Sequence, residues 1–317
     1  IKCKYELDGF AGQRGFTSFG KEHAKGKKHG DLKEFWHFGQ YLSDTEYSKF
    51  GYPKNLSVKE IPEFNEIGKL VYKSLEKTAL NVLRATSLFL NLDEYHFDQY
   101  VNKGNSILRA IHYPPINTKP TGAERAAAHG DINLITLLMG AHGKGLQVLN
   151  NDGEWIDAIA DKDEIVINVG DMLSRYTNNR LKSTIHRVVN PPKEHWTKSR
   201  YSIPFFLHPV GSMSLKVLNS CIDKDNPKKY SDEIKNVFKS GMASNSEVLK
   251  QINQIYYKSG VTIDPHTAVG VGAVNKLSFN DCVVLSTAHP CKFPDATNNA
   301  INKHEKLPKE LQYVCLL

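Results

Sequence analysis

The sequence contains no apolar run that approaches the ~18–20 residues needed to span a membrane. Residues 1–10 also lack the apolar core of a secretory signal peptide. We therefore expect no membrane partner. The first residue is Ile1 rather than Met, so we expect the natural start of the protein to lie upstream.

Cysteine is scarce and unpaired. The five cysteines, Cys3, Cys221, Cys282, Cys291 and Cys315, form no C-x-x-C pair. An odd and dispersed set argues against a disulfide framework and against a cysteine-based zinc site. We therefore expect a reduced, cytoplasmic setting.

Internal repeats and low-complexity segments are also absent, and the formal net charge is only +7. The densest basic run, residues 25–29, is short and contains a glycine. Such a run is typical of a solvated loop, so we expect no nucleic-acid partner. With 40% hydrophobic and 24% charged residues, the composition is that of a globular protein.

The N-terminal third predicts helices and irregular structure. Residues 5–29 are rich in glycine and aromatic residues without a helical period, which favours loops. Asp31 is predicted to cap a short helix over residues 32–41. The strongest helical segment is 61–90, where Pro62 suits the first turn. Its predicted apolar stripe comprises Ile67, Leu70, Val71, Leu75, Leu80, Leu83 and Leu88.

From residue 107 short apolar runs alternate with turn signals, which predicts strands. The turn 150–153 joins two of them as a hairpin. The pattern predicts a mainly β fold with flanking helices, as a β-barrel or a double-sheet jelly roll. The predicted strands are 107–113, 134–138, 146–149, 155–158, 165–169, 184–189 and 201–207.

The C-terminal tail does not continue this β pattern. Residues 247–257 and 303–311 are predicted helices, and residues 283–285 a buried strand. We divide the chain into an N-terminal helical and irregular region (1–106), a jelly-roll domain (107–233) and an α/β tail (234–317).

Two histidines and an aspartate stand out as candidate metal ligands. His129 and Asp131 are two residues apart, and on an extended backbone such side chains share a face. His186 follows at a distance that allows several strands to cross and return. Two histidines and one carboxylate form the facial triad of non-heme Fe(II) oxygenases. The alternative is that these are ordinary surface or core side chains.

Arg200 and Ser202 suggest a carboxylate site. They also lie two residues apart, so a guanidinium and a hydroxyl can bind one carboxylate together. Tyr113 adds a phenol at the end of an earlier strand. The alternatives are a salt bridge on a strand for Arg200 and a packing role for Tyr113.

The segment 126–138 resembles the metal-site strand of the isopenicillin N synthase-like Fe(II)/2-oxoglutarate dioxygenases. The similarity extends over about residues 5–233. The similar segments are 12–16, 31–37, 145–148, 168–173, 183–192 and 200–209.

The resemblance implies that His129, Asp131 and His186 hold Fe(II). It further implies that Arg200 and Ser202 bind the distal carboxylate of 2-oxoglutarate and that Tyr113 helps to seat it. The expected reaction uses O2 and a small organic substrate, which loses a hydrogen atom to a ferryl species while succinate and CO2 are released.

The chain departs from the family at two positions. Ile111 stands where the family has an asparagine, which removes one polar contact to the co-substrate. Gly130 stands where many relatives have glutamate, and its position between the ligands should point away from the metal. The family usually also has barrel strands ahead of what is Ile1 here.

Two other readings remain open. Isopenicillin N synthase uses the same triad without 2-oxoglutarate, and its Arg/Ser pair then holds a substrate carboxylate. Alternatively, the chain is an inactive fusion fragment, because residues 234–317 resemble the C-terminal end of threonine synthase over 259–270 and 286–294. That family's Schiff-base lysine lies in sequence absent here, so we expect no pyridoxal-phosphate chemistry. The sequence indicates neither the primary substrate nor an oligomeric state.

Overall fold

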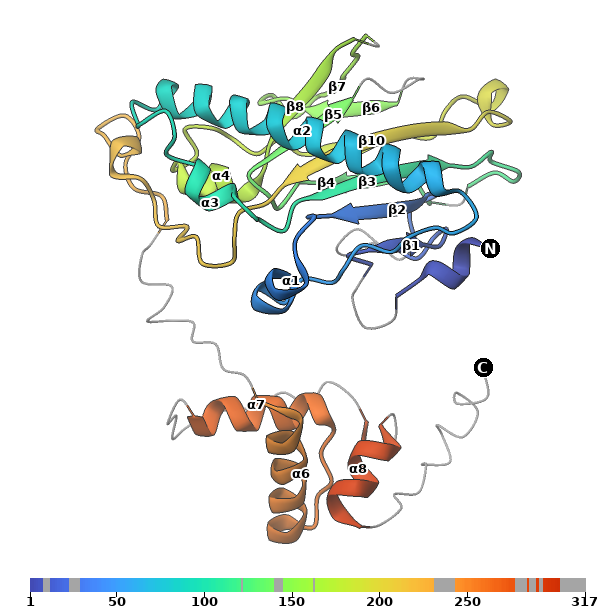
Figure 1. Cartoon of the computed structure of the whole chain (residues 1–317), viewed down its shortest axis with the longest axis vertical. Coiled ribbons are helices and arrows are strands. Elements are labelled where there is room, and N and C mark those ends of the chain that lie inside the picture. Colours follow the sequence, from blue (N-terminus) through green and yellow to red (C-terminus); the bar gives the residue numbers. More distant parts are fainter. Residues whose placement is uncertain are drawn as a thin grey trace. The chain divides into compact units, whose positions relative to one another are not determined.

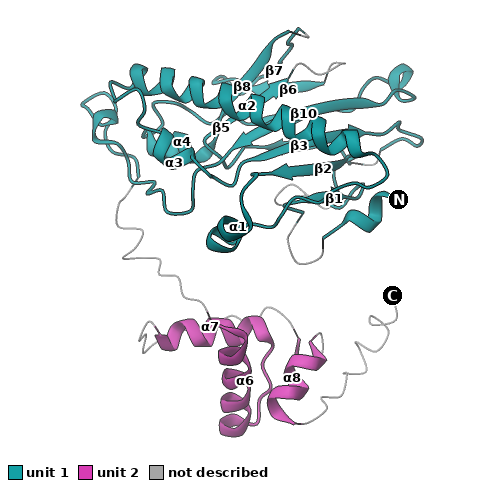
Figure 2. Cartoon of the chain, viewed as in Figure 1, with its two compact units in different colours: residues 1–230 teal, residues 231–317 magenta. Residues whose placement is uncertain are grey.

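The computed structural model describes residues 1–7, 12–22, 29–120, 122–139, 145–161, 163–230, 243–276, 284, 289–290 and 293–302. The chain forms two compact units, residues 1–230 and 231–317 (Figure 2). The basic residues 25–28, residues 283 and 285 of the expected strand, the expected helix 303–311, and Cys282, Cys291 and Cys315 lie outside the described residues.

The first unit contains two antiparallel sheets (Figure 1). A six-stranded sheet has the order β1-β2-β3-β10-β5-β8, and a four-stranded sheet has the order β4-β9-β6-β7. The expected mainly β class with flanking helices is confirmed. The strands are β1 (Gly15–Thr17), β2 (Glu34–Gly39), β3 (Ile107–Tyr113), β4 (Ala126–His129), β5 (Ile135–Met139), β6 (Leu146–Leu149), β7 (Trp155–Asp157), β8 (Ile165–Val169), β9 (His186–Val188) and β10 (Arg200–Leu207).

The predicted strands from residue 107 onward are all present. β3, β6 and β8 have the predicted bounds, and the other predicted strands differ at their ends by a few residues. The predicted hairpin joins β6 and β7. Its turn is held by the Asn150 side chain, whose Oδ1 accepts from the backbone N–H groups of Asp152 and Glu154, and Gly153 takes a positive φ of 82°.

The helix predicted over residues 32–41 is wrong, because this segment contains β2. Phe35, Trp36 and Phe38 are buried, and aromatic side chains suit a strand that is covered on both faces. β2 pairs with β3 along its whole length and with β1, which lies in the segment expected to be irregular. Region 1–106 therefore contributes two strands to the larger sheet.

The long helix predicted over residues 61–90 is confirmed as α2 (Pro62–Phe89), and its buried face matches the predicted stripe in part, at Leu75 and Leu83. α2 runs along the six-stranded sheet (Figure 1) and buries Tyr72, Ala79 and Leu83. Tyr72 packs edge-on against Phe205 of β10, with ring centroids 5.1 Å apart. Ile67, Leu70 and Leu88 of the predicted stripe are exposed instead.

The described residues of the first unit also form three shorter helices and three 3₁₀ turns. No helix within the described residues is long and apolar enough to cross a membrane. The short elements are η1 (Lys2–Tyr5), α1 (Asp44–Phe50), α3 (Asp98–Val101), α4 (Asp171–Tyr176), η2 (Lys193–His195) and η3 (Asn219–Cys221).

The described part of the second unit consists of the helices α6 (Asn245–Ser259), α7 (Pro265–Lys276) and α8 (Pro294–Ile301). α6 contains the predicted helix 247–257. It begins with a capping box between Ser244 and Glu247 and ends at Gly260, which has a φ of 74°. α7 and α8 pack on α6 through small and aliphatic side chains, so the described part of this unit is α-helical. Because residues 283 and 285 of the expected strand are not described, the α/β class of the tail stays a prediction.

Candidate metal centre

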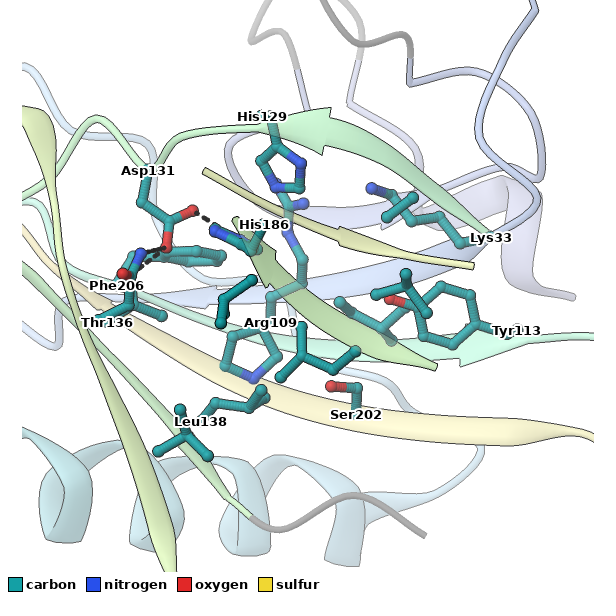
Figure 3. A pocket seen from close by; sticks show the side chains of 18 residues that line it. Lys33, Arg109, Tyr113, His129, Asp131, Thr136, Leu138, His186, Ser202 and Phe206 are labelled. Atoms are coloured by element: carbon teal, nitrogen blue, oxygen red, sulfur yellow. Dashed lines mark hydrogen bonds and ion pairs between the residues drawn. The ribbon is translucent and has the colours of Figure 1, made fainter. Parts of the chain in front are cut away.

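His129 and His186 lie opposite each other on β4 and β9, which pair in antiparallel register. Their ring centroids are 4.4 Å apart. Asp131 follows β4 directly, and its Oδ1 lies 3.7 Å from Nε2 of His186. One potential ligand atom from each of the three side chains lies within 4.8 Å of the other two. The structure thus brings together the three residues that the sequence indicated (Figure 3).

A bulge in β4 creates this arrangement. Ala126 pairs with Val188, whereas His129 pairs with His186, so β4 has one residue more than β9 between the two pairs. Without the extra residue, Ala128 would lie opposite His186. A shift of one residue in a strand moves a side chain to the other face, so the bulge aims His129 at His186.

Backbone carbonyl groups orient both imidazole rings. Nδ1 of His129 donates to the carbonyl oxygen of Ala127 at 2.6 Å, and Nδ1 of His186 donates to that of Thr184 at 3.2 Å. A carbonyl oxygen can only accept, so Nδ1 carries the proton in each ring. In the neutral imidazole the lone pair is then on Nε2. In His186 this is the atom that faces Asp131.

Thr136 and Asn168 hold the carboxylate of Asp131. Oδ2 accepts a hydrogen bond from Oγ1 of Thr136 at 2.7 Å and from Nδ2 of Asn168 at 3.2 Å. Thr136 on β5 and Asn168 on β8 are register partners, so the larger sheet fixes both donors. Oδ1 remains directed at His186. Neither residue stands out in the sequence by its type or spacing, although each lies in a segment that resembles the family.

The surroundings of His129 favour its neutral imidazole, which is the form that binds metals. Burial is the main cause that lowers the pKa of His129, and the neighbouring His186 lowers it further. The hydrogen bond to Ala127 and the charge of Asp131 oppose this shift without cancelling it. The ring is therefore neutral at neutral pH, as a metal ligand must be.

A cavity adjoins the three side chains and is lined by both sheets (Figure 3). The hydroxyl groups of Tyr113 and Ser202 point into it. Its wall is otherwise largely apolar, which excludes water and strengthens polar contacts inside. The apolar lining comprises Ile111, Ala126, Leu138, Leu146, Val148, Val166, Val188, Pro204 and Phe206.

Arg200 is 3% exposed and does not itself line the cavity, but it packs against Tyr113, which does. It pairs with Tyr113 across β10 and β3, and its guanidinium carbon lies 5.1 Å from the centroid of the Tyr113 ring. Its Nε and Nη1 are buried without a hydrogen-bond partner. Burial lowers the pKa of Arg200, while Tyr113 acts in the opposite direction. A buried cation with free N–H groups favours an anionic ligand.

Lys33 and Arg109 also line the cavity, and the sequence analysis missed them. Nζ of Lys33 pairs with Glu22 at 2.7 Å and with Asp31 at 2.8 Å, and Arg109 pairs with Glu22 at 3.1 Å. Nε of Arg109 also donates to His37 at 2.6 Å. The two positive and two negative charges balance. This network closes one side of the cavity without leaving a net charge.

Sequence profiles of two families match different parts of the chain. A sequence profile of the 2OG-Fe(II) oxygenase superfamily matches residues 104–209. A profile of the threonine synthase C-terminal family matches residues 267–315. The resemblance of the first part to Fe(II)/2-oxoglutarate oxygenases and of the tail to threonine synthase is thereby confirmed.

Curated relatives carry related names. The chain is 34% identical over 177 residues to the 2-oxoglutarate-Fe(II) type oxidoreductase hxnY of Emericella nidulans. This alignment covers 55% of this chain and 50% of that protein. The chain is also 32% identical over 234 residues to the proline hydroxylase buaE of Petromyces alliaceus. This alignment covers 70% of this chain and 71% of that protein. The chain thus spans about half the length of the first of these relatives.

Solved structures share the fold. A 2OG-Fe(II) oxygenase family protein from Caulobacter crescentus is 45% identical, with a TM-score of 0.66 over 73% of this chain and 74% of that chain. A full-length Neurospora crassa protein solved in complex with alpha-KG, which is 2-oxoglutarate, is 28% identical, with a TM-score of 0.61 over 73% and 71%. The expected jelly-roll fold is confirmed by these neighbours.

Proposed function

Because this chain belongs to the 2OG-Fe(II) oxygenase superfamily, we propose that it oxidises a small organic molecule with O2 while converting 2-oxoglutarate to succinate and CO2. One observation carries this proposal, namely the convergence of His129, Asp131 and His186 beside a cavity. Arg200, which packs against Tyr113 of that cavity, has two buried nitrogens without a hydrogen-bond partner.

The three converging side chains fit Fe(II). Two neutral imidazoles and one carboxylate on one side of a metal leave its other positions open, as in the facial triad of non-heme iron enzymes. His129, Asp131 and His186 would hold the ion. When bound there, iron supplies the redox chemistry that couples decarboxylation of 2-oxoglutarate to oxidation of the substrate.

Ser202 and Tyr113 of the cavity, together with the neighbouring Arg200, would bind and orient the co-substrate. Arg200 and Ser202 would hold the distal carboxylate of 2-oxoglutarate, and the Tyr113 hydroxyl would donate to it. The free N–H groups of Arg200 support this role, because a carboxylate would satisfy them. The apolar wall keeps water away from the reacting groups and contacts the non-polar part of the substrate.

Within the superfamily, we assign the chain to the isopenicillin N synthase-like branch. We further propose that the protein works in a reducing compartment such as the cytoplasm. The described cysteines, Cys3 and Cys221, are both free, in agreement with a reducing environment. Fractionation of cells followed by immunoblotting tests the compartment. Recovery of the protein only from an oxidising compartment contradicts it.

Anaerobic titration with Fe(II) followed by turnover tests the proposed reaction. We expect one iron per chain, and succinate in step with O2 uptake when 2-oxoglutarate is supplied with a substrate. Proline and thymine are the first substrates to test, because one relative is named proline hydroxylase and the Neurospora crassa neighbour has been solved with thymine. The H186A variant is the control and should produce no succinate.

Two outcomes contradict the proposal. O2 uptake without succinate, in the presence of a substrate that bears a carboxylate, identifies a 2-oxoglutarate-independent oxidase. Absence of stoichiometric iron binding identifies an inactive fragment.

A further inference from the structure

Arg125 is a second buried guanidinium near Tyr113, which lines the cavity, and it lies outside the segments that resemble the family. It directly precedes β4 and is 4% exposed. Its Nη2 donates to the carbonyl oxygen of Lys198 at 3.2 Å, whereas its Nε is buried without a hydrogen-bond partner. Arg125 therefore carries a buried charge that its surroundings satisfy only in part.

Arg125 and Arg200 pack against the same ring. The guanidinium carbon of Arg125 lies 5.8 Å from the centroid of Tyr113, and that of Arg200 lies 5.1 Å from it. The two charges act on each other: burial is the main cause that lowers the pKa of Arg125, and Arg200 lowers it further. Two like charges thus lie near the ring of Tyr113, whose hydroxyl group points into the cavity (Figure 3).

The described residues provide no counter-charge for this pair. Among them, no ion pair joins Arg125 or Arg200 to a carboxylate, and Nε of both and Nη1 of Arg200 lack partners. Arg109 and Lys33, on another part of the cavity, are by contrast both paired with Glu22. Burying two like charges without an anion is unfavourable, so the pair favours a bound anion.

We propose that Arg125 supplies a second positive charge for the distal carboxylate of 2-oxoglutarate, next to Arg200. This inference rests on the proposed function. It makes Arg125 a determinant of co-substrate choice: the site selects 2-oxo acids that carry a second carboxylate and discriminates against those that end in a methyl group. The contact to Lys198 fixes the side chain so that the charge stays near Tyr113.

Calorimetric titration of the anaerobic, Fe(II)-loaded full chain tests the inference with two ligands. 2-Oxoglutarate and 2-oxopentanoate share the 2-oxo acid group and the five-carbon length, but only the first has a distal carboxylate. We expect R125M to raise the Kd of 2-oxoglutarate about tenfold or more and to change that of 2-oxopentanoate less than about twofold. R125K, which keeps the charge, should stay within about threefold of the parent for both.

A second uncharged variant distinguishes the loss of the charge from a folding defect. R125Q can still donate to the carbonyl oxygen of Lys198 and should behave as R125M does. R84M removes an arginine that pairs with Asp98 on the surface of α2, and it should leave both Kd values unchanged.

The outcomes separate the two proposals. A parent protein that binds both ligands equally refutes the distal carboxylate site, and with it the role of Arg125. A parent that prefers 2-oxoglutarate, with R125M and R125Q retaining that preference, refutes the role of Arg125 alone. If R125M and R125Q weaken the binding of both ligands equally, the role of Arg125 is also refuted, because the side chain is then purely structural.

Discussion

His129 and His186 oppose each other across the β4–β9 pair, with ring planes inclined by 55° and centroids 4.4 Å apart. The strand register sets this distance, because paired residues of an antiparallel ladder hold their side chains on one face. The bulge before His129 selects which residue of β4 takes that position. The geometry of the candidate metal centre is therefore a property of the backbone.

The first prediction concerns the metal ligands. Each of H129A, D131A and H186A should abolish stoichiometric Fe(II) binding, because two remaining protein ligands hold a divalent ion weakly. Anaerobic titration followed by metal analysis measures the stoichiometry. H195A, which removes an exposed histidine of η2, is the control and should bind one iron per chain. Full iron binding by any of the three variants would overturn the assignment of that ligand.

The second prediction concerns Thr136, which orients Asp131. T136V keeps the shape of the side chain but loses the hydrogen bond to Oδ2 of Asp131. We expect iron affinity to fall by about 10–100-fold, as for other residues that orient a metal ligand. T78V, on the exposed side of α2, is the matched control. Equal affinities for T136V and the parent would show that Asn168 alone suffices.

The third prediction concerns the opposite effects of Arg200 on 2-oxoglutarate binding and on the stability of the ligand-free protein. R200M should weaken 2-oxoglutarate binding by ~2–5 kcal/mol, because the ligand's carboxylate loses a buried partner. Without ligand, the same variant should raise the free energy of unfolding by about 1–3 kcal/mol, since unsatisfied buried N–H groups disappear. Calorimetry and urea denaturation measure the two effects. A ligand-free R200M protein less stable than the parent contradicts the second part.

The fourth prediction contrasts two glycines near Asp131. A Cβ on Gly130 would lie 3.4 Å from Asp171 and Ile185, an ordinary contact, whereas a Cβ on Gly170 would lie 2.0 Å from the carbonyl oxygen of Asn133. G130A should therefore stabilise the first unit by about 0.4–1 kcal/mol, through the entropy of the unfolded chain. G170A should destabilise it by at least about 1–3 kcal/mol. Urea denaturation compares them, and the reverse order would refute this packing.

The fifth prediction concerns pH and Glu22. Burial opposes the charge of this carboxylate, but Arg109 and Lys33 outweigh burial and lower its pKa. A lowered pKa in the folded state contributes stability that is present above the ordinary pKa near 4.5 and is lost as the pH falls through the lowered value. The free energy of unfolding of E22Q should therefore depend less steeply on pH below about 4.5 than that of the parent.

The exposed carboxylate Glu94 provides the control for Glu22. E94Q should keep the pH dependence of the parent in urea denaturation at each pH. Identical slopes for E22Q and E94Q would show that the pairs of Glu22 with Lys33 and Arg109 contribute no net stability.

The sequence by itself determined most of the strands and the identity of the three converging side chains. Alternation and turn signals are local properties, so the bounds of β3 and β8 and the β6–β7 hairpin could be predicted. The segment 32–41 could not, because its aromatic residues fit a helix or a strand until β3 offers hydrogen bonds to β2. The buried face of α2 was likewise decided by the sheet beneath it.

Only the tertiary structure decided how the site is completed. The bulge in β4, the support of Asp131 by Thr136 and Asn168, and the approach of Arg125 to Tyr113 join segments that are distant along the chain. No local pattern encodes such contacts, because they follow from strand order and register. The sequence thus specified which groups could perform the chemistry, and the packing of two sheets specified where each group points.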